Sequence, residues 1–134
     1  MAHPSTPASL SVSVLIVDDS ADTREMYACA LAYAGFSVLD ADNGADALSR
    51  AAEALPDVIV TDLSIPGIDG FELLARIQTH PRTDRIPVIV LSGRADADAS
   101  QRAIAAGAAA FLLKPCSPEL LIDEVRRALC PSRA

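Results

Sequence analysis

Five short apolar runs recur along the chain, and polar, glycine or proline residues bound each of them. The runs span residues 12–17, 36–41, 57–62, 87–92 and 109–113. Continuous apolar runs that are too short for a helix are typical of strands buried on both faces of a parallel sheet. The second run includes Ser37 and Asp40, which favours an edge position in that sheet.

The segments between these runs carry the start and stop signals of helices. Four residues stand where a side chain can cap a first helical turn: Ser20, Asn43, Asp69 and Ser117. Helices are therefore predicted over about 20–34, 43–55, 69–79, 94–106 and from 117 onward. Gly35 and Gly107 are the expected stops of the first and fourth helices.

Apolar side chains on these helices predict how they pack. The residues that share one face are Met26, Ala30 and Tyr33 in the first helix, and Leu121, Val125 and Ala128 in the last. The helix over 94–106 has Ile104 as its only large apolar residue. We therefore expect that helix to be weakly anchored.

Strand and helix alternate five times, which predicts an α/β fold with a doubly wound, five-stranded parallel sheet, (βα)5. The flavodoxin-like strand order 2-1-3-4-5 fits best, because it leaves the more polar second strand at an edge. A length of 134 residues predicts one domain. We expect a flexible tail over 1–10, the domain over 11–130 and a second tail over 131–134.

Composition narrows the class of partner. The formal net charge is -7, with no visible stripe of lysine and arginine, which argues against a nucleic-acid-binding face. Neither a leader segment nor an apolar run of membrane-spanning length is visible, so we expect a cytoplasmic protein with no membrane partner. The cysteines lack metal-site spacing and predict reduced thiols, with Cys29 and Cys116 as small apolar residues.

The chemistry lies at the ends of the predicted strands. The first strand ends at Asp18 and Asp19, the third at Asp62, the fourth at Ser92 and the fifth at Lys114. In the order 2-1-3-4-5 these ends are neighbours, and ligands of open α/β sheets bind there. Clustered carboxylates repel one another unless cations compensate. Lys114 is one such cation, and a set of oxygen ligands without His or Cys suits Mg²⁺ together with a phosphoryl group.

These motifs resemble those of a known family. They are Val17-Asp18-Asp19, Asp62-Leu-Ser-Ile-Pro66-Gly-Ile-Asp-Gly70, Leu91-Ser92-Gly93 and Phe111-Leu-Leu-Lys114-Pro115. Together they resemble the receiver domain of bacterial two-component response regulators, in the stand-alone form similar to chemotaxis-type regulators. The resemblance covers about residues 12–129.

The resemblance implies a role for each residue of the site. Asp62 is the phosphoacceptor, and Asp18, Asp19, Asp62 and the main-chain carbonyl of Ser64 hold Mg²⁺. Lys114 contacts the phosphoryl oxygens, and the Lys114-Pro115 bond is cis. Ser92 and Phe111 form the switch pair, although Phe111 replaces the commoner tyrosine. Ser64 and Arg94 stand where family members vary, which leaves the lifetime of the phosphate open.

The function that follows is a phosphorylation-dependent switch and not an enzyme. A sensor histidine kinase or a phosphotransfer protein supplies the phosphoryl group, and a downstream protein target reads the fourth helix, fifth strand and fifth helix. Three alternatives remain: a Mg²⁺-dependent aspartyl phosphatase, a flavin- or nucleotide-binding module, and a receiver used only for docking. Each residue also has a plainer reading, since Asp18-Asp19 can be a helix-terminal charge pair, Ser92 a turn hydroxyl, Lys114 a surface lysine and Phe111 a packing residue.

Overall fold

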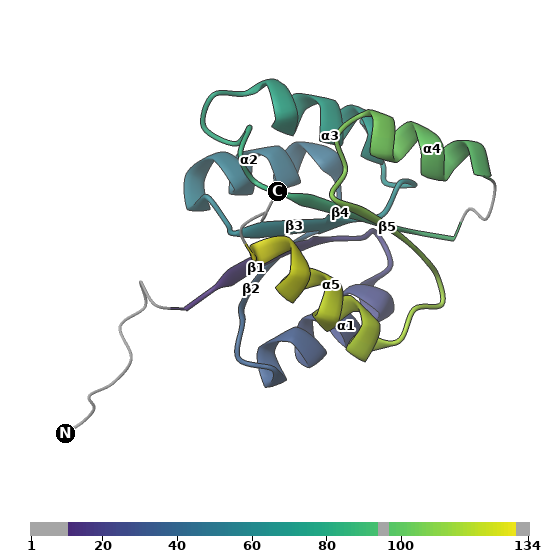
Figure 1. Cartoon of the computed structure of the whole chain (residues 1–134). Helices are drawn as coiled ribbons and strands as arrows, with labels where there is room; N and C mark the ends of the chain where they lie inside the picture. Colours follow the sequence, from purple (N-terminus) through teal and green to yellow (C-terminus); the bar gives the residue numbers. More distant parts are fainter. Residues whose placement is uncertain (1–10, 94–96, 131–134) are drawn as a thin grey trace.

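The chain folds into a central sheet with helices on both of its faces (Figure 1). The structure is a computed structural model that describes residues 11–93 and 97–130. Its elements are β1 (Ser13–Val17), α1 (Ala21–Tyr33), β2 (Ser37–Ala41), α2 (Gly44–Ala54), β3 (Val58–Thr61), α3 (Gly70–Thr79), β4 (Val88–Ser92), α4 (Ala97–Ala105), β5 (Ala110–Leu113) and α5 (Pro118–Leu129). All strand pairs are parallel, in the order β2-β1-β3-β4-β5, which confirms the predicted fold and the edge position of β2.

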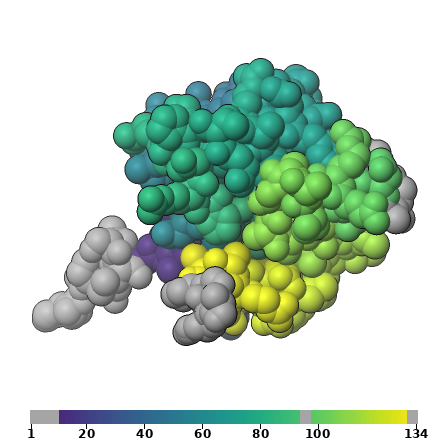
Figure 2. Space-filling model, turned by 45° about the horizontal axis from the view of Figure 1, so that its top comes forward, coloured from purple at the N-terminus to yellow at the C-terminus, as the bar shows by residue number. Residues whose placement is uncertain are grey.

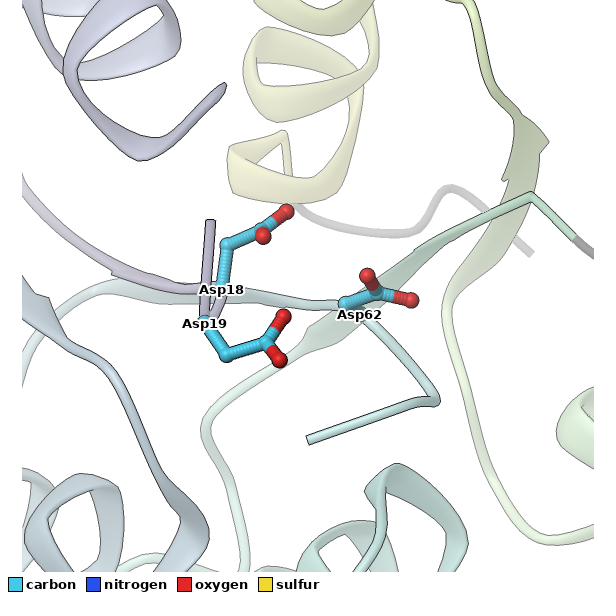
Figure 3. Close-up of side chains that lie close together, drawn as sticks. All are labelled: Asp18, Asp19 and Asp62. Atoms are coloured by element: carbon cyan, nitrogen blue, oxygen red, sulfur yellow. The ribbon is translucent and has the colours of Figure 1, made fainter. Parts of the chain in front are cut away.

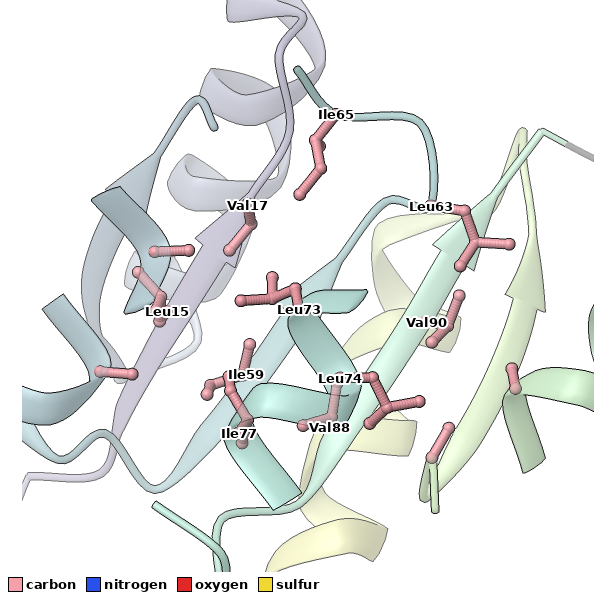
Figure 4. Packing of buried hydrophobic residues seen from close by; sticks show 14 of the residues in the cluster. Leu15, Val17, Ile59, Leu63, Ile65, Leu73, Leu74, Ile77, Val88 and Val90 are labelled. Atoms are coloured by element: carbon pink, nitrogen blue, oxygen red, sulfur yellow. The ribbon is translucent and has the colours of Figure 1, made fainter. Parts of the chain in front are cut away.

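Strand alternation divides the apolar residues between two cores. Helices α2, α3 and α4 cover one face of the sheet, and α1 and α5 cover the other (Figure 1). Leu15, Ile59 and Val88 point into the first core, where they meet the buried leucines and Ile77 of α3 (Figure 4). Their neighbours along the strands point into the second core against Tyr27, Leu31, Leu121 and Val125. A strand sandwiched between two apolar layers needs no polar face, which explains the continuous runs in the sequence.

The four predicted capping residues act as caps. The side chains of Ser20, Asn43, Asp69 and Ser117 each accept a hydrogen bond from the main-chain N–H three residues later. These bonds satisfy amides that the first helical turn leaves without a partner. The caps therefore fix the points where the chain leaves a strand end and enters a helix.

The predicted packing face of α1 is wrong. Tyr33 is 96% exposed and Met26 is half-exposed, whereas Tyr27 and Leu31 are buried. Apolar and alanine residues occur on several sides of this helix, so periodicity alone does not choose between two stripes. Tyr27 decides the choice in the structure, because its buried hydroxyl finds a partner across the core. Cys29 is also exposed rather than packed, while Cys116 is buried as predicted.

Helix α4 has no large buried apolar side chain among its described residues, which agrees with the predicted weak anchorage. Ile104 is half-exposed, and the helix rests on Ala99 and Ala103, which are fully buried. Small side chains let the helix lie close to the sheet but bury little apolar area. The predicted helix begins at Arg94, and residues 94–96 lie outside the described part of the chain.

The predicted tails over 1–10 and 131–134 also lie outside the described residues. Among the helices that the structure describes, none has the length and apolar character needed to cross a membrane.

Candidate functional site

Strand register brings the predicted residues to one edge of the sheet. Val17 at the end of β1 pairs with Thr61 at the end of β3, so Asp18 and Asp62 leave adjacent strands at the same level. The main-chain N–H of Asp62 donates to the carbonyl of Val17 at 3.0 Å. On the other side, the N–H of Lys114 donates to the carbonyl of Ser92 at 2.8 Å. The predicted convergence of strand ends is therefore found.

Three carboxylates gather at this edge. Asp18, Asp19 and Asp62 each offer an oxygen, and these oxygens all lie within 4.8 Å of one another. Figure 3 shows the side chains next to one another at the ends of β1 and β3. Asp18 and Asp62 are buried, with 3% and 9% of their surface exposed, whereas Asp19 is exposed. Charge of one sign is thus concentrated at the boundary between the protein interior and solvent.

Lys114, the only lysine of the chain, forms ion pairs with two of these carboxylates. Its Nζ donates to Oδ2 of Asp18 at 2.7 Å and to Oδ2 of Asp62 at 2.9 Å. Burial of the ammonium lowers the pKa of Lys114, but these hydrogen bonds outweigh burial and leave the pKa above its usual value. Lys114 therefore carries its positive charge at neutral pH.

Main-chain amides hold the other carboxylate oxygens. The N–H of Ser20 donates to Oδ1 of Asp18 at 2.9 Å, and the N–H of Ser64 donates to Oδ1 of Asp62 at 3.2 Å. Asp18 and Asp62 are thus held in the same way: one oxygen of each carboxylate accepts from Lys114, and the other accepts from a main-chain amide. Such bonds favour the ionised carboxylate and fix its orientation.

Ser92 and Phe111 lie on the same side of the sheet. Ser92 is fully buried at the end of β4. Phe111 is partly buried and packs against the core under α3 and α4. It pairs with Val90, two residues before Ser92, and residues two apart along a strand share a face. The Lys114-Pro115 bond that follows β5 is cis, as predicted.

Two residues next to the site were missed in the sequence. Arg24 donates from Nη1 to the main-chain carbonyl of Asp18 at 2.9 Å, and from Nε to Asp40 at 3.3 Å. Tyr27 donates its hydroxyl to the carbonyl of Cys116 at 2.6 Å. The available signal was the second apolar stripe of α1, formed by Tyr27 and Leu31. Nothing in the pattern indicates Arg24, since an arginine on a helix ordinarily faces solvent.

A hollow of about 520 Å³ opens elsewhere, between α2 and the end of α3, and its lining includes Leu48, Arg76 and His80. It contains none of the clustered carboxylates. The charged groups therefore converge away from this hollow, at the carboxyl edge of the sheet.

The donor set fits a hard divalent cation. Asp18, Asp19 and Asp62 supply carboxylate oxygens only, and Mg²⁺ prefers oxygen ligands of this kind, binding through few carboxylates and keeping several waters. The exposed Asp19 leaves the cluster open toward solvent. That opening suits an ion that retains part of its water shell.

Fold and site together define an α/β protein with an acidic cluster and a lysine at the carboxyl edge of its sheet. The chain belongs to the response regulator receiver domain family, whose model matches residues 14–126. Receiver domains of this family act in two-component signalling that depends on phosphorylation, and they bind Mg²⁺ at an acidic cluster. They are generally switches rather than enzymes.

Individual relatives agree with this membership. The chain is 36% identical over 117 residues to the phosphate regulon transcriptional regulatory protein PhoB of Pseudomonas aeruginosa, covering 87% of this chain and 51% of that protein. Among solved structures, a putative response regulator of Chloroflexus aurantiacus has a TM-score of 0.85 at 36% identity, covering 89% of this chain and 98% of that one. The chemotaxis response regulator CheY4 of Vibrio cholerae has a TM-score of 0.83 at 34% identity, covering 89% and 99%.

The relatives differ in length. The chain spans about half of the Pseudomonas phosphate regulon regulator and 27% of the C4-dicarboxylate transport regulator DctD of the same organism. The similarity therefore concerns the receiver part of those longer regulators.

Proposed function

We propose that this chain is a signalling switch in which Asp62 accepts a phosphoryl group from a histidine of a sensor kinase or phosphotransfer protein. The observation that supports this most directly is the position of the Asp62 carboxylate. It lies at a strand end, binds the Lys114 ammonium at 2.9 Å and belongs to the acidic cluster. The cluster has an ammonium and an open side, which is what an incoming dianion requires.

The transfer is a displacement at phosphorus. A carboxylate oxygen of Asp62 forms a bond to phosphorus while the bond between phosphorus and the donor nitrogen breaks. The electron pair of the broken bond stays on the donor imidazole, and the product is an acyl phosphate. Lys114 lies close enough to Asp62 to contact the transferred oxygens, and its fixed charge stabilises the negative charge spread over them.

Mg²⁺ belongs to the same proposal. The residues that would hold it are Asp18, Asp19, Asp62 and the carbonyl of Ser64. When bound, the ion supplies positive charge next to the transferring group. The residues of the chain supply orientation, since backbone amides already fix Asp18 and Asp62.

We further propose that Ser92 and Phe111 convert the new charge into a change of surface. A phosphoryl oxygen offers a strong acceptor to the Ser92 hydroxyl, and movement of Ser92 at the end of β4 shifts α4, the next helix along the chain. Phe111 then packs more deeply beneath that helix. The helix, β5 and α5 adjoin one another on the face seen in Figure 2, and each contributes one large apolar side chain that is about half exposed: Ile104, Leu113 and Leu120. This surface suits a downstream protein target.

The test is covalent labelling. Incubation with acetyl phosphate and Mg²⁺ should add one phosphoryl group, measured by mass spectrometry, and hydroxylamine should remove it as it removes other acyl phosphates. Asp62→Asn should abolish the labelling. The matched control is Asp57→Asn, which changes an exposed aspartate next to the opposite end of β3 and should label normally. Full labelling of Asp62→Asn would refute the assignment of the acceptor.

A further inference from the structure

We propose that α1 acts as a brace for the site, with Tyr27 positioning Lys114 and Arg24 positioning the Asp18-Asp19 segment. This inference rests on the proposed function, because it concerns how the acceptor site is held. Tyr27 and Arg24 are three residues apart on one helix and therefore lie on neighbouring positions of its surface. Each contacts a different side of the site. Tyr27 contacts the segment after β5 that carries Lys114 (the lysine wall), and Arg24 contacts the segment after β1 that carries Asp18 and Asp19 (the acidic wall).

Tyr27 holds the wall that carries the lysine. Its side chain is 2% exposed, and its hydroxyl donates to the carbonyl of Cys116 at 2.6 Å. Cys116 stands two residues after Lys114 and is itself buried. Between them, Pro115 has no N–H and cannot donate a backbone hydrogen bond. The Tyr27 hydroxyl therefore holds this segment from across the core. It does so next to a residue, Pro115, that cannot hold the segment through an N–H of its own.

Lys114 depends on anchors of this kind. A lysine side chain has four rotatable bonds, so the position of its ammonium follows from where its backbone is fixed. Upstream, the backbone is fixed by the bond from its own N–H to Ser92. Downstream, the Cys116 carbonyl is fixed by Tyr27. With both sides fixed, Nζ reaches Asp18 and Asp62 at the same time.

Arg24 holds the opposite wall. Its guanidinium donates to the carbonyl of Asp18 and pairs with Asp40 at the end of β2. The side chain of Arg24 is 18% exposed, and its bond to the Asp18 carbonyl is partly buried, whereas its partner Asp40 is 54% exposed. The carbonyl it holds belongs to the peptide bond that joins Asp18 to Asp19. Arg24 thereby fixes the direction in which the acidic pair leaves β1.

The contacts of Tyr27 and Arg24 predict separate defects when each is removed. Loss of the tyrosine hydroxyl should displace the ammonium and slow phosphoryl transfer even at saturating Mg²⁺, by about tenfold. Loss of the guanidinium should displace the acidic pair and weaken Mg²⁺ binding, also by about tenfold. A residue that only stabilised the fold would not separate the two quantities in this way.

The experiment on the lysine wall compares two tyrosines of one helix in the full chain. Tyr27→Phe removes the buried hydroxyl, and Tyr33→Phe, the matched control, removes the hydroxyl of a residue that is 96% exposed. Both are assayed for the rate of Asp62 labelling by acetyl phosphate and for Mg²⁺ affinity. A third measurement is the ¹⁵N resonance of the Lys114 side chain, which gives a single signal because the chain has one lysine.

Tyr27→Phe should label about tenfold more slowly, shift the lysine resonance and keep the Mg²⁺ affinity of the wild type. Tyr33→Phe should match the wild type in all three measurements. An unshifted resonance with a wild-type rate in Tyr27→Phe overturns the proposal, as does an equal loss of rate and Mg²⁺ affinity. If the wild type does not label on Asp62, the proposed function fails, and the lysine resonance alone still decides whether Tyr27 positions Lys114.

The experiment on the acidic wall uses Arg24→Met, with Arg126→Met on the exposed face of α5 as the control. Arg24→Met should weaken Mg²⁺ binding while the ¹⁵N signal of Lys114 in the metal-free protein stays close to that of the wild type. Unchanged Mg²⁺ affinity in Arg24→Met contradicts the proposal that Arg24 positions the Asp18-Asp19 segment.

Discussion

Asp18 and Asp62 are bound on both of their oxygens, and Asp19 differs from them. Lys114 pairs with the two buried carboxylates, while Asp19 faces solvent and adds a third negative charge within the cluster. Neutralising each of the three carboxylates should therefore have a different effect on the stability of the protein. Neutralising Asp18 or Asp62 would leave the lysine short of a partner, whereas neutralising Asp19 leaves both ion pairs intact.

We predict that Asp19→Asn weakens Mg²⁺ binding without harming the fold. Relief of like-charge repulsion should raise the free energy of unfolding in the absence of metal by less than about 1 kcal/mol, because the group is exposed and screened. Mg²⁺ should raise the melting temperature of the wild type through mass action and have little effect on the variant. Asp123→Asn, at an exposed position of α5, serves as the control, and an equal Mg²⁺ response in Asp19→Asn would contradict the metal role.

We predict that Tyr27→Phe destabilises the protein at neutral pH and less so in alkali. Losing the hydroxyl leaves the buried Cys116 carbonyl without this donor, at a cost of about 1–2 kcal/mol. Burial raises the pKa of Tyr27. A raised pKa means that the stabilisation is complete below the unfolded value of about 10 and is lost as the pH rises through the folded value.

Urea unfolding of both proteins at neutral pH and above about pH 10 checks this prediction. The difference in free energy of unfolding between wild type and Tyr27→Phe should shrink in alkali. Tyr33→Phe should follow the wild type at both pH values. A difference that stayed constant with pH would show that the hydroxyl does not titrate with folding.

At the scale of elements, α4 is held by contacts that bury little apolar area. Ala99 and Ala103 pack on the sheet, and the guanidinium of Arg102 lies 4.1 Å from the centre of the Phe71 ring at the start of α3. A helix with little buried apolar area opens more easily than its neighbours. This is the element that the proposed switch has to move.

We predict that Ser92→Ala still accepts the phosphoryl group but transmits it poorly. Without the hydroxyl, no hydrogen bond draws the end of β4 toward the phosphoryl oxygens. NMR shift changes on phosphorylation should then be much smaller at Phe111 and along α4 than in the wild type. Ser49→Ala, on the exposed side of α2, should give the wild-type pattern. A full pattern in Ser92→Ala would mean that the signal travels by Lys114 or by residues 62–70 instead.

We predict that Arg102→Ala loosens α4. A cation–π contact at an exposed site contributes about 0.5–1 kcal/mol, so amide hydrogen exchange within α4 should accelerate by about two- to fivefold. Gln101→Ala, at the neighbouring exposed position, should leave exchange unchanged. Equal exchange in the two variants would show that the ring contact does not hold the helix.

At the scale of the whole molecule, the strand ends were predictable and the helix faces less so. A strand buried on both sides carries no charged residue, so the first charged residue after an apolar run marks its end, as Asp18, Asp62 and Lys114 do. Caps are equally local, because one side chain and one amide suffice. These two signals were enough to predict the topology and the convergence of the charged groups.

Long-range partners explain what could not be predicted. The hydroxyl of Tyr27 bonds to a carbonyl 89 residues away, and no local pattern encodes that pairing. For the same reason Met26 and Tyr33 were assigned to the buried side of α1, and Arg24 was not assigned to the site. The weak anchorage of α4 was predictable, because Ile104 is its only large apolar residue. Its contact with the core through Ala99 and Ala103 was not predictable, since a buried alanine leaves no distinct signal in an alanine-rich chain.

The single lysine has a practical consequence for work with this protein. Every other strongly basic side chain is an arginine, so reagents that acylate or crosslink side-chain amines have one target, held between two carboxylates. Such reagents attack the neutral amine, which the raised pKa of Lys114 makes scarce, and any reaction that does occur removes the charge of the candidate site. Attachment to a surface or a dye is therefore better made through the exposed thiols of Cys29 and Cys130.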